Sequence, residues 1–102
     1  MNYANIKPDT IETLRRYADH GIPTGDFLRA VLENNLFEAA GRADPENLAA
    51  LGDICGYVYN EMPAGCWGNP ERVREWLRRF EIRRQVERSQ GQLTEALAEE
   101  AP

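Results

Sequence analysis

Arginine, asparagine and aromatic side chains are the residues of this chain whose chemistry best suits the recognition of a small ligand. A guanidinium group can hold a phosphate through paired N–H donors, and an aromatic ring can stack on a flat heterocycle. An asparagine amide both donates and accepts hydrogen bonds, so it can pair with the edge of such a ring. The residues that we predict to bind a ligand are Arg29, Asn34, Asn35, Arg42, Asn47, Tyr57, Asn60, Trp67, Arg72 and Arg74.

Catalytic chemistry has little support in the same sequence. His20 is the single histidine, and the two cysteines, Cys55 and Cys66, stand eleven positions apart. A zinc site needs about four ligands, usually in closely spaced pairs, and covalent catalysis needs a nucleophile with a base beside it. No phosphate-binding glycine loop occurs in the sequence. We therefore predict that the protein is not an enzyme and has no catalytic residue, no metal and no cofactor.

The length and composition are those of one globular domain, with 102 residues of which 42% are hydrophobic and 28% charged. No run approaches the ~20 apolar residues of a membrane span, and the start of the chain lacks the basic and apolar regions of a signal peptide. We therefore expect a cytoplasmic protein with reduced thiols and no membrane contact. The net charge of −5 argues against general binding to nucleic acids, which requires a basic surface.

Helix signals recur four times along the chain. Gly21 is placed to end a first helix in the left-handed conformation, and Asp44 and Asn69, each followed by a proline, are placed to cap the third and fourth. The periodic segments predict helices near residues 9–20, 24–40, 45–61 and 70–88. The expected fold is all-α, a compact bundle of four helices in one domain over residues 1–88. Residues 89–102 form an acidic tail that either extends the last helix or folds back on the domain.

The apolar pattern also predicts which side chains face the core. In the second helix Asn35 falls in the middle of the apolar face, so we expect a buried amide whose hydrogen-bond partners are either structural or supplied by a ligand. In the third helix Cys55, Val58 and Tyr59 continue the apolar face, whereas Tyr57 lies among polar residues. Tyr57 is therefore expected to be exposed.

Trp67 follows a stretch rich in proline and glycine, between the third and fourth predicted helices. Proline and glycine exclude regular structure there. A large ring in such a place either closes the end of the core or lines a ligand pocket. The residues alone leave both interpretations open.

The last predicted helix carries two separate apolar stripes. The first comprises Val73, Trp76, Leu77 and Phe80, and the second comprises Ile82, Val86, Leu93 and Leu97. The first faces the core. The second lies on nearly the opposite side of the helix, so we predict that it forms a homo-oligomer contact. The alternative is a tail folded back on its own domain.

Charge is unevenly distributed over the same region. Residues 71–88 contain seven arginines and four glutamates, whereas residues 89–102 contain three glutamates and no basic residue. The basic segment is either a solvated helix face with Glu–Arg pairs or a surface that binds phosphate or an acidic partner.

Several motifs, taken together, resemble those of a family of small proteins encoded by tailed bacteriophages and prophages. They are GIPTGDFLRAVLENNL over residues 21–36, RAD over 42–44 followed by Asn47, YNEMP over 59–63 and CWG over 66–68. The likeness covers about residues 10–80. It implies the context of a phage accessory protein, a class that includes inhibitors of host enzymes and oligomeric proteins that sequester nucleotide immune signals. It carries over no functional residue.

These observations lead to one functional expectation and one alternative. We expect a non-enzymatic protein of the bacterial cytoplasm that binds and sequesters a phosphorylated, nucleotide-derived ligand. The alternative is a helical interaction module that docks on a host or phage protein. A pocket lined by several of the predicted residues favours the first, and a flat exposed apolar patch favours the second.

Overall fold

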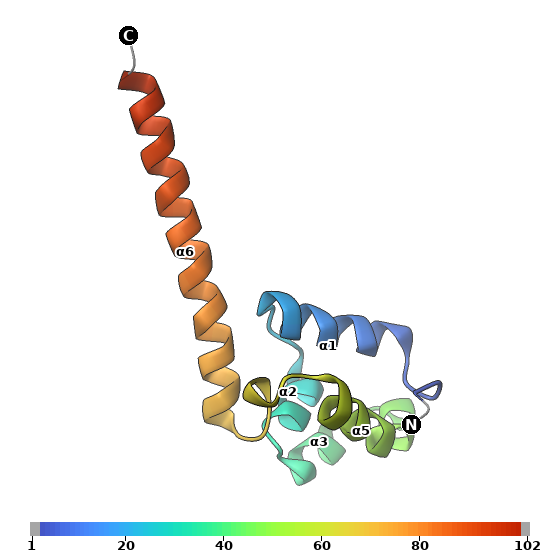
Figure 1. Ribbon diagram of the computed structural model, residues 1–102. Helices are drawn as coiled ribbons and strands as arrows, with labels where there is room; N and C mark the ends of the chain where they lie inside the picture. Colours follow the sequence, from blue (N-terminus) through green and yellow to red (C-terminus); the bar gives the residue numbers. More distant parts are fainter. Residues whose placement is uncertain (1–2, 101–102) are drawn as a thin grey trace.

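The computed structural model describes the backbone of residues 3–100 and the side chains of residues 3–90. Within that part of the chain the fold is all-helical, as predicted, and contains no strand. The helices are α1 (Pro8–His20), α2 (Asp26–Leu32), α3 (Leu36–Arg42), α4 (Pro45–Ala49), α5 (Leu51–Glu61), the 3-10 turn η1 (Ala64–Cys66) and α6 (Pro70–Glu100). Figure 1 shows the short helices gathered at the base of the long α6.

The prediction of one helix over residues 24–40 is wrong, because the chain breaks at two asparagines. Asn34 has a φ of 62°, in the left-handed region that asparagine tolerates better than most residues. The Asn35 N–H donates to the carbonyl oxygen of Ala30 at 2.9 Å, which closes the end of α2. Asn35 then caps α3, because its side-chain oxygen accepts from the Glu38 N–H at 3.3 Å. Asn35 is exposed, so the expected buried amide is also wrong.

The predicted helix over residues 45–61 is likewise two helices. Asp44 caps α4 as predicted, with its carboxylate accepting from the Asn47 N–H at 2.7 Å. The helix breaks at the buried Ala50, whose ψ of 3° is not helical. The break changes which residues of α5 face inward: Tyr57 is 8% exposed and Tyr59 is 72% exposed, the reverse of the prediction. The bundle therefore has six α-helices in the described residues rather than four.

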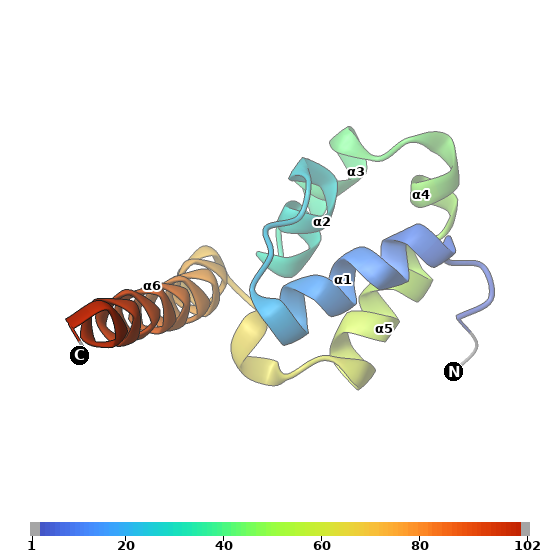
Figure 2. The ribbon, with the colours of Figure 1, turned by 90° about the horizontal axis from the view of Figure 1, so that it is seen from above.

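The core lies between α1 and the other short helices. Seen from above in Figure 2, α1 crosses the domain with α5 on one side and α2, α3 and α4 on the other. Leu14 and Tyr17 of α1, Leu32 of α2 and Ile54 of α5 are almost completely buried. The segment before α1 also joins the core, since the Tyr3 ring packs edge-on against Tyr57 with the ring centroids 5.2 Å apart.

The first turns of α6 attach it to this domain. Asn69 caps α6 as predicted, accepting from the Arg72 N–H at 2.8 Å, and Val73 is 1% exposed. Gly21 ends α1 in the predicted left-handed conformation, and a Cβ on it would lie 2.3 Å from the Cβ of Phe80. That close approach requires glycine. The end of α1 is thus held against the side of α6.

Beyond its first turns α6 leaves the domain as a single rod (Figure 1), which makes the molecule 64 Å long and only 26 and 22 Å across. The helix continues to Glu100, so residues 89–100 extend it. Ile82 and Val86 are 48% and 49% exposed on this rod. The side chains of Leu93 and Leu97, the rest of the predicted stripe, lie outside the described residues. None of the helices, over the residues described, is long and apolar enough to cross a membrane.

Candidate ligand-binding site

A cavity of about 550 Å³ lies between the end of α2, one side of α5 and the segment that follows η1. This volume is within the range of ~300–1,000 Å³ that small-molecule sites occupy. We call the cavity the aromatic pocket. It is lined by Val31, Asn34, Cys55, Gly56, Val58, Tyr59, Asn60 and Trp67.

Trp67 is held in the wall of the aromatic pocket through its neighbours in the chain. The carbonyl oxygen of Cys66 accepts a buried hydrogen bond of 2.7 Å from the Tyr17 hydroxyl. The Gly68 N–H donates to the carbonyl oxygen of Leu32 at 2.8 Å. Arg72 adds a longer contact of 3.4 Å from its Nη1 to the Trp67 carbonyl oxygen. The residues on both sides of Trp67 are therefore fixed to other elements, which limits where the ring can move.

The indole N–H of Trp67 is buried and has no hydrogen-bond acceptor among the described residues. The other tryptophan is different, because Trp76 donates its indole N–H to the carbonyl oxygen of Tyr17 at 3.0 Å. A buried donor without an acceptor costs ~1–3 kcal/mol. The Trp67 ring lines the aromatic pocket, but its nitrogen is buried, so a bound acceptor would reach the N–H only after the ring shifts.

A second ring and two amides complete the aromatic pocket. The Tyr59 ring lies 5.7 Å from the Trp67 ring, centroid to centroid, with an angle of 53° between the planes. Asn34 enters the wall from the left-handed turn after α2, and Asn60 enters it from α5. Two aromatic surfaces and two amides in a largely apolar cavity are typical of a site that selects flat, weakly polar molecules.

The Cys55 thiol, which lines the aromatic pocket, is a poor nucleophile. Partial burial raises the pKa of the Cys55 thiol, and the residues that line the pocket include neither an imidazole nor a carboxylate to deprotonate it. Cys66, directly before Trp67, is fully buried, and burial raises the pKa of its thiol to about 11. Both thiols therefore stay protonated near neutral pH.

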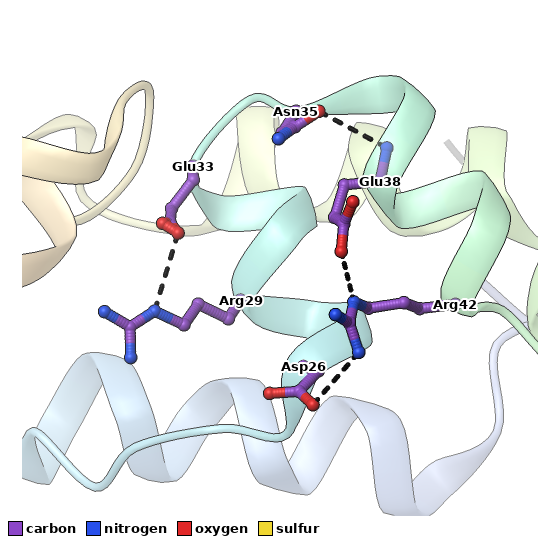
Figure 3. A network of polar contacts seen from close by, with 6 residues as sticks. All are labelled: Asp26, Arg29, Glu33, Asn35, Glu38 and Arg42. Carbon is purple, nitrogen blue, oxygen red and sulfur yellow. Dashed lines mark hydrogen bonds and ion pairs between the residues drawn. The ribbon is translucent and has the colours of Figure 1, made fainter.

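Two of the arginines predicted to hold phosphate are paired with carboxylates instead. Arg42 is bonded through Nη1 to Asp26 at 3.2 Å and through Nε to Glu38, whose carboxylate raises the arginine pKa (Figure 3). The Arg29 Nε lies 3.5 Å from a Glu33 carboxylate oxygen. These residues line a different, smaller cavity of about 160 Å³, together with Asn35. The charge available for a phosphate is much reduced there.

The other predicted binding residues are dispersed. Tyr57 lines a separate cavity with Tyr3 and Arg15, and Asn47 supplies its main-chain N–H to the cap of α4. Arg72 supports the segment that carries Trp67, and Arg74 is exposed on α6. Of the ten predicted residues, the structure brings Asn34, Asn60 and Trp67 together in the aromatic pocket.

Tyr59 and Cys55 are two exposed lining residues whose place in a pocket the sequence did not predict. Both were assigned to the core, although their spacing of four did indicate one shared helix face. A core face and the wall of an open pocket have the same apolar pattern, so sequence periodicity does not separate them.

Comparison of the chain with protein-family models, with curated proteins and with solved structures gives no match. The likeness to small phage proteins therefore rests on the sequence motifs alone. What the protein binds has to be inferred from the pocket itself.

Proposed function

We propose that the protein binds a small molecule with a flat, unsaturated ring in the aromatic pocket and holds it without changing it chemically. The observation that carries this proposal is the pair of rings of Trp67 and Tyr59, which both line the cavity with their centroids 5.7 Å apart. A ring nitrogen or carbonyl oxygen at the edge of a heterocycle would also be a suitable acceptor for the buried indole N–H of Trp67, once the ring shifts towards the ligand. Nucleobases combine such acceptors with a flat stacking surface.

The remaining walls support the same class of ligand. Tyr59 is 72% exposed and offers a ring face beside Trp67, on which a base can stack. Base–aromatic stacking contributes ~1–3 kcal/mol per base in other proteins. The amide of Asn34 can pair with donors or acceptors on the ring edge, which would give selectivity among bases.

The phosphate of a nucleotide would contribute less than the sequence suggested. No charged side chain of the described residues lines the aromatic pocket, and Arg29 and Arg42 are held by carboxylates elsewhere. Most of the affinity should therefore come from the ring, with any phosphate directed towards solvent. Sequestration of a nucleotide-derived signal remains compatible with this arrangement, because sequestration requires binding and no reaction.

Calorimetry with matched ligands tests this proposal. The ligands are adenosine, guanosine, cytidine and uridine, each compared with its 5′-monophosphate. We expect at least one nucleoside to bind, with the monophosphate changing the affinity by less than about tenfold, equivalent to ~1.4 kcal/mol. Recovery of the ligand unchanged after heat denaturation would support binding without reaction.

Two variants assign that binding to the pocket. Tyr59→Ala removes the exposed ring, and Trp67→Phe keeps a ring but removes the indole N–H. Loss of one neutral hydrogen bond of ~1 kcal/mol weakens binding about fivefold. Trp76→Phe is the matched control, because its indole lies outside the pocket. Equal affinity of the Trp67→Phe variant and the unaltered protein, or no binding of any ligand tested, would refute the proposal.

A protein partner is a second candidate, favoured by the surface of α3. Phe37 is 89% exposed and its neighbour Leu36 is 61% exposed, and adjacent large apolar side chains so accessible are typical of a docking site. Phe37→Ser should then abolish capture of a specific protein from bacterial lysate, whereas Leu48→Ser, at an exposed leucine on α4, should not. Equal capture by both variants would remove this candidate.

A further inference from the structure

The part of α6 that projects from the domain has an apolar face with nothing packed on it among the described residues. Ile82 and Val86 are about half exposed and lie one helical turn apart. Ile82 is nine residues after the buried Val73, which places it on the opposite side of the helix. Ile82 and Val86 also line a shallow hollow of about 390 Å³ with Gln85, Ser89 and Gln90. This is the form of surface that accepts side chains from a second helix.

We propose that this face binds α6 of a second copy of the chain, with the two helices antiparallel. The helix has 31 residues, and Arg84 of this helix donates from Nη1 to the carbonyl oxygen of His20 in α1 at 3.0 Å. From Arg84 to its last residue, Glu100, the helix runs for about 24 Å at 1.5 Å per residue. Isolated helices are marginal in water, and packing of an apolar face supplies most helical stability.

The charge along α6 selects the antiparallel orientation. Residues 71–88 have a net charge of +3 from seven arginines and four glutamates, whereas residues 89–102 contain only glutamates among their charged side chains. Parallel helices would place the arginine-rich segments side by side. Antiparallel helices place each arginine-rich segment beside the acidic end of the other copy and also oppose the two helix dipoles.

The position of the domain supports the same orientation. The short helices cluster at the beginning of α6, as Figure 1 shows, so a parallel pair would bring two domains to the same end. In an antiparallel pair the two domains lie at opposite ends of the paired helices. Positions 82, 86, 89 and 93 follow the alternating four-and-three spacing of a coiled coil, and all except the serine at position 89 are apolar. Antiparallel pairing of 82 with 93, and of 86 with 89, satisfies this spacing throughout.

The molecular mass in solution is the first test. Sedimentation of the full chain should give twice the monomer mass of 11.6 kDa. Val86→Asp and, separately, Ile82→Asp place a charge in the contact and should give a folded monomer. Glu87→Ala, on another side of the same turn, should remain a dimer. A monomeric unaltered chain, or a dimer that survives both aspartate substitutions, would overturn the proposal.

Disulfide cross-linking then tests the orientation. In a Cys55→Ser background, Ile82→Cys mixed with Leu93→Cys should form a disulfide-linked dimer under mild oxidation, because the two positions oppose each other. Ile82→Cys alone should not, since antiparallel helices separate the two copies of position 82 by about 16 Å along the axis. Efficient cross-linking of Ile82→Cys to itself would establish a parallel pair and contradict the proposal.

Discussion

The hydroxyl of Tyr17 donates a hydrogen bond of 2.7 Å to the carbonyl oxygen of Cys66, and both residues are at most 1% exposed. This bond joins α1 to the segment that carries Trp67. The carbonyl oxygen of Tyr17 also accepts from the Trp76 indole at 3.0 Å. The side chain of Tyr17 thus holds the segment that forms the wall of the aromatic pocket. Its main-chain carbonyl holds the first turns of α6.

Tyr17→Phe should lower the free energy of unfolding by ~1–3 kcal/mol, because it leaves the buried Cys66 carbonyl without its donor. Urea denaturation measures the change. Tyr59→Phe, which removes a hydroxyl from a largely exposed ring, is the control and should leave the midpoint almost unchanged. Equal midpoints for Tyr17→Phe and the unaltered protein would show that the bond adds no stability.

The two tryptophans should respond differently to the same change. Trp76→Phe removes a satisfied hydrogen bond, whereas Trp67→Phe removes a buried donor that lacks a partner in the described part of the chain. The loss of ring volume is the same in both variants. We therefore expect Trp76→Phe to lower the free energy of unfolding by ~1 kcal/mol more than Trp67→Phe does. A reversed order in thermal or urea denaturation would mean that Trp67 has an acceptor in the free protein.

Alanine substitutions at two glycines should have opposite effects. Gly68 has a φ of +124°, and a Cβ on it would lie 3.0 Å from Arg72 Nη1, so Gly68→Ala should destabilise the protein by ~1–3 kcal/mol. Gly52 lies within α5 and has nothing within 4 Å of such a Cβ. Gly52→Ala should therefore stabilise the protein by up to ~1 kcal/mol through helix propensity. Changes of the same sign at both positions would contradict this explanation.

Stability should decrease in alkaline solution because of two buried groups. Burial raises the pKa of Cys66 to about 11, above the value of ~8.5 in an unfolded chain, and burial also raises the pKa of Tyr17. Below pH ~8.5 both groups are protonated in the folded and in the unfolded chain, so the stability that they contribute to the fold is fully present. As the pH rises towards 11 the unfolded chain loses these protons first, and stability decreases. Urea denaturation between pH 7 and 10.5 measures the slope, which should be shallower in Cys66→Ala; an identical slope would exclude the thiol as a cause.

Three helix ends were predictable from the sequence, whereas α1 and α2 begin at residues without the expected side-chain caps. Asp44 and Asn69 cap α4 and α6, and Gly21 ends α1, as their residue types indicated. The break at Asn34 was not predicted, because Leu32 and Leu36 keep the spacing of one continuous helix across it. The unpredicted break at Ala50 starts α5 in a new phase, which exchanges the positions of Tyr57 and Tyr59.

The candidate site was only partly predictable for a similar reason. Trp67 and Asn34 meet because the Gly68 N–H bonds to the Leu32 carbonyl oxygen. This bond joins two main-chain groups far apart in the sequence, and the pattern of side chains does not predict it. The pairing of Arg29 with Glu33 was visible as a spacing of four, and it argued against a free guanidinium there.

The most direct test of the proposed function is the indole N–H resonance of Trp67 in a two-dimensional ¹H–¹⁵N spectrum. The chain has two tryptophans, so it gives two indole signals, which Trp67→Phe and Trp76→Phe assign. Titration with adenosine, guanosine, cytidine and uridine should move the Trp67 signal saturably downfield for at least one of them, as its N–H gains an acceptor. The Trp76 signal, already bonded to Tyr17, should stay in place. A Trp67 signal that stays unmoved at millimolar concentrations of all four nucleosides would contradict ring binding in the aromatic pocket.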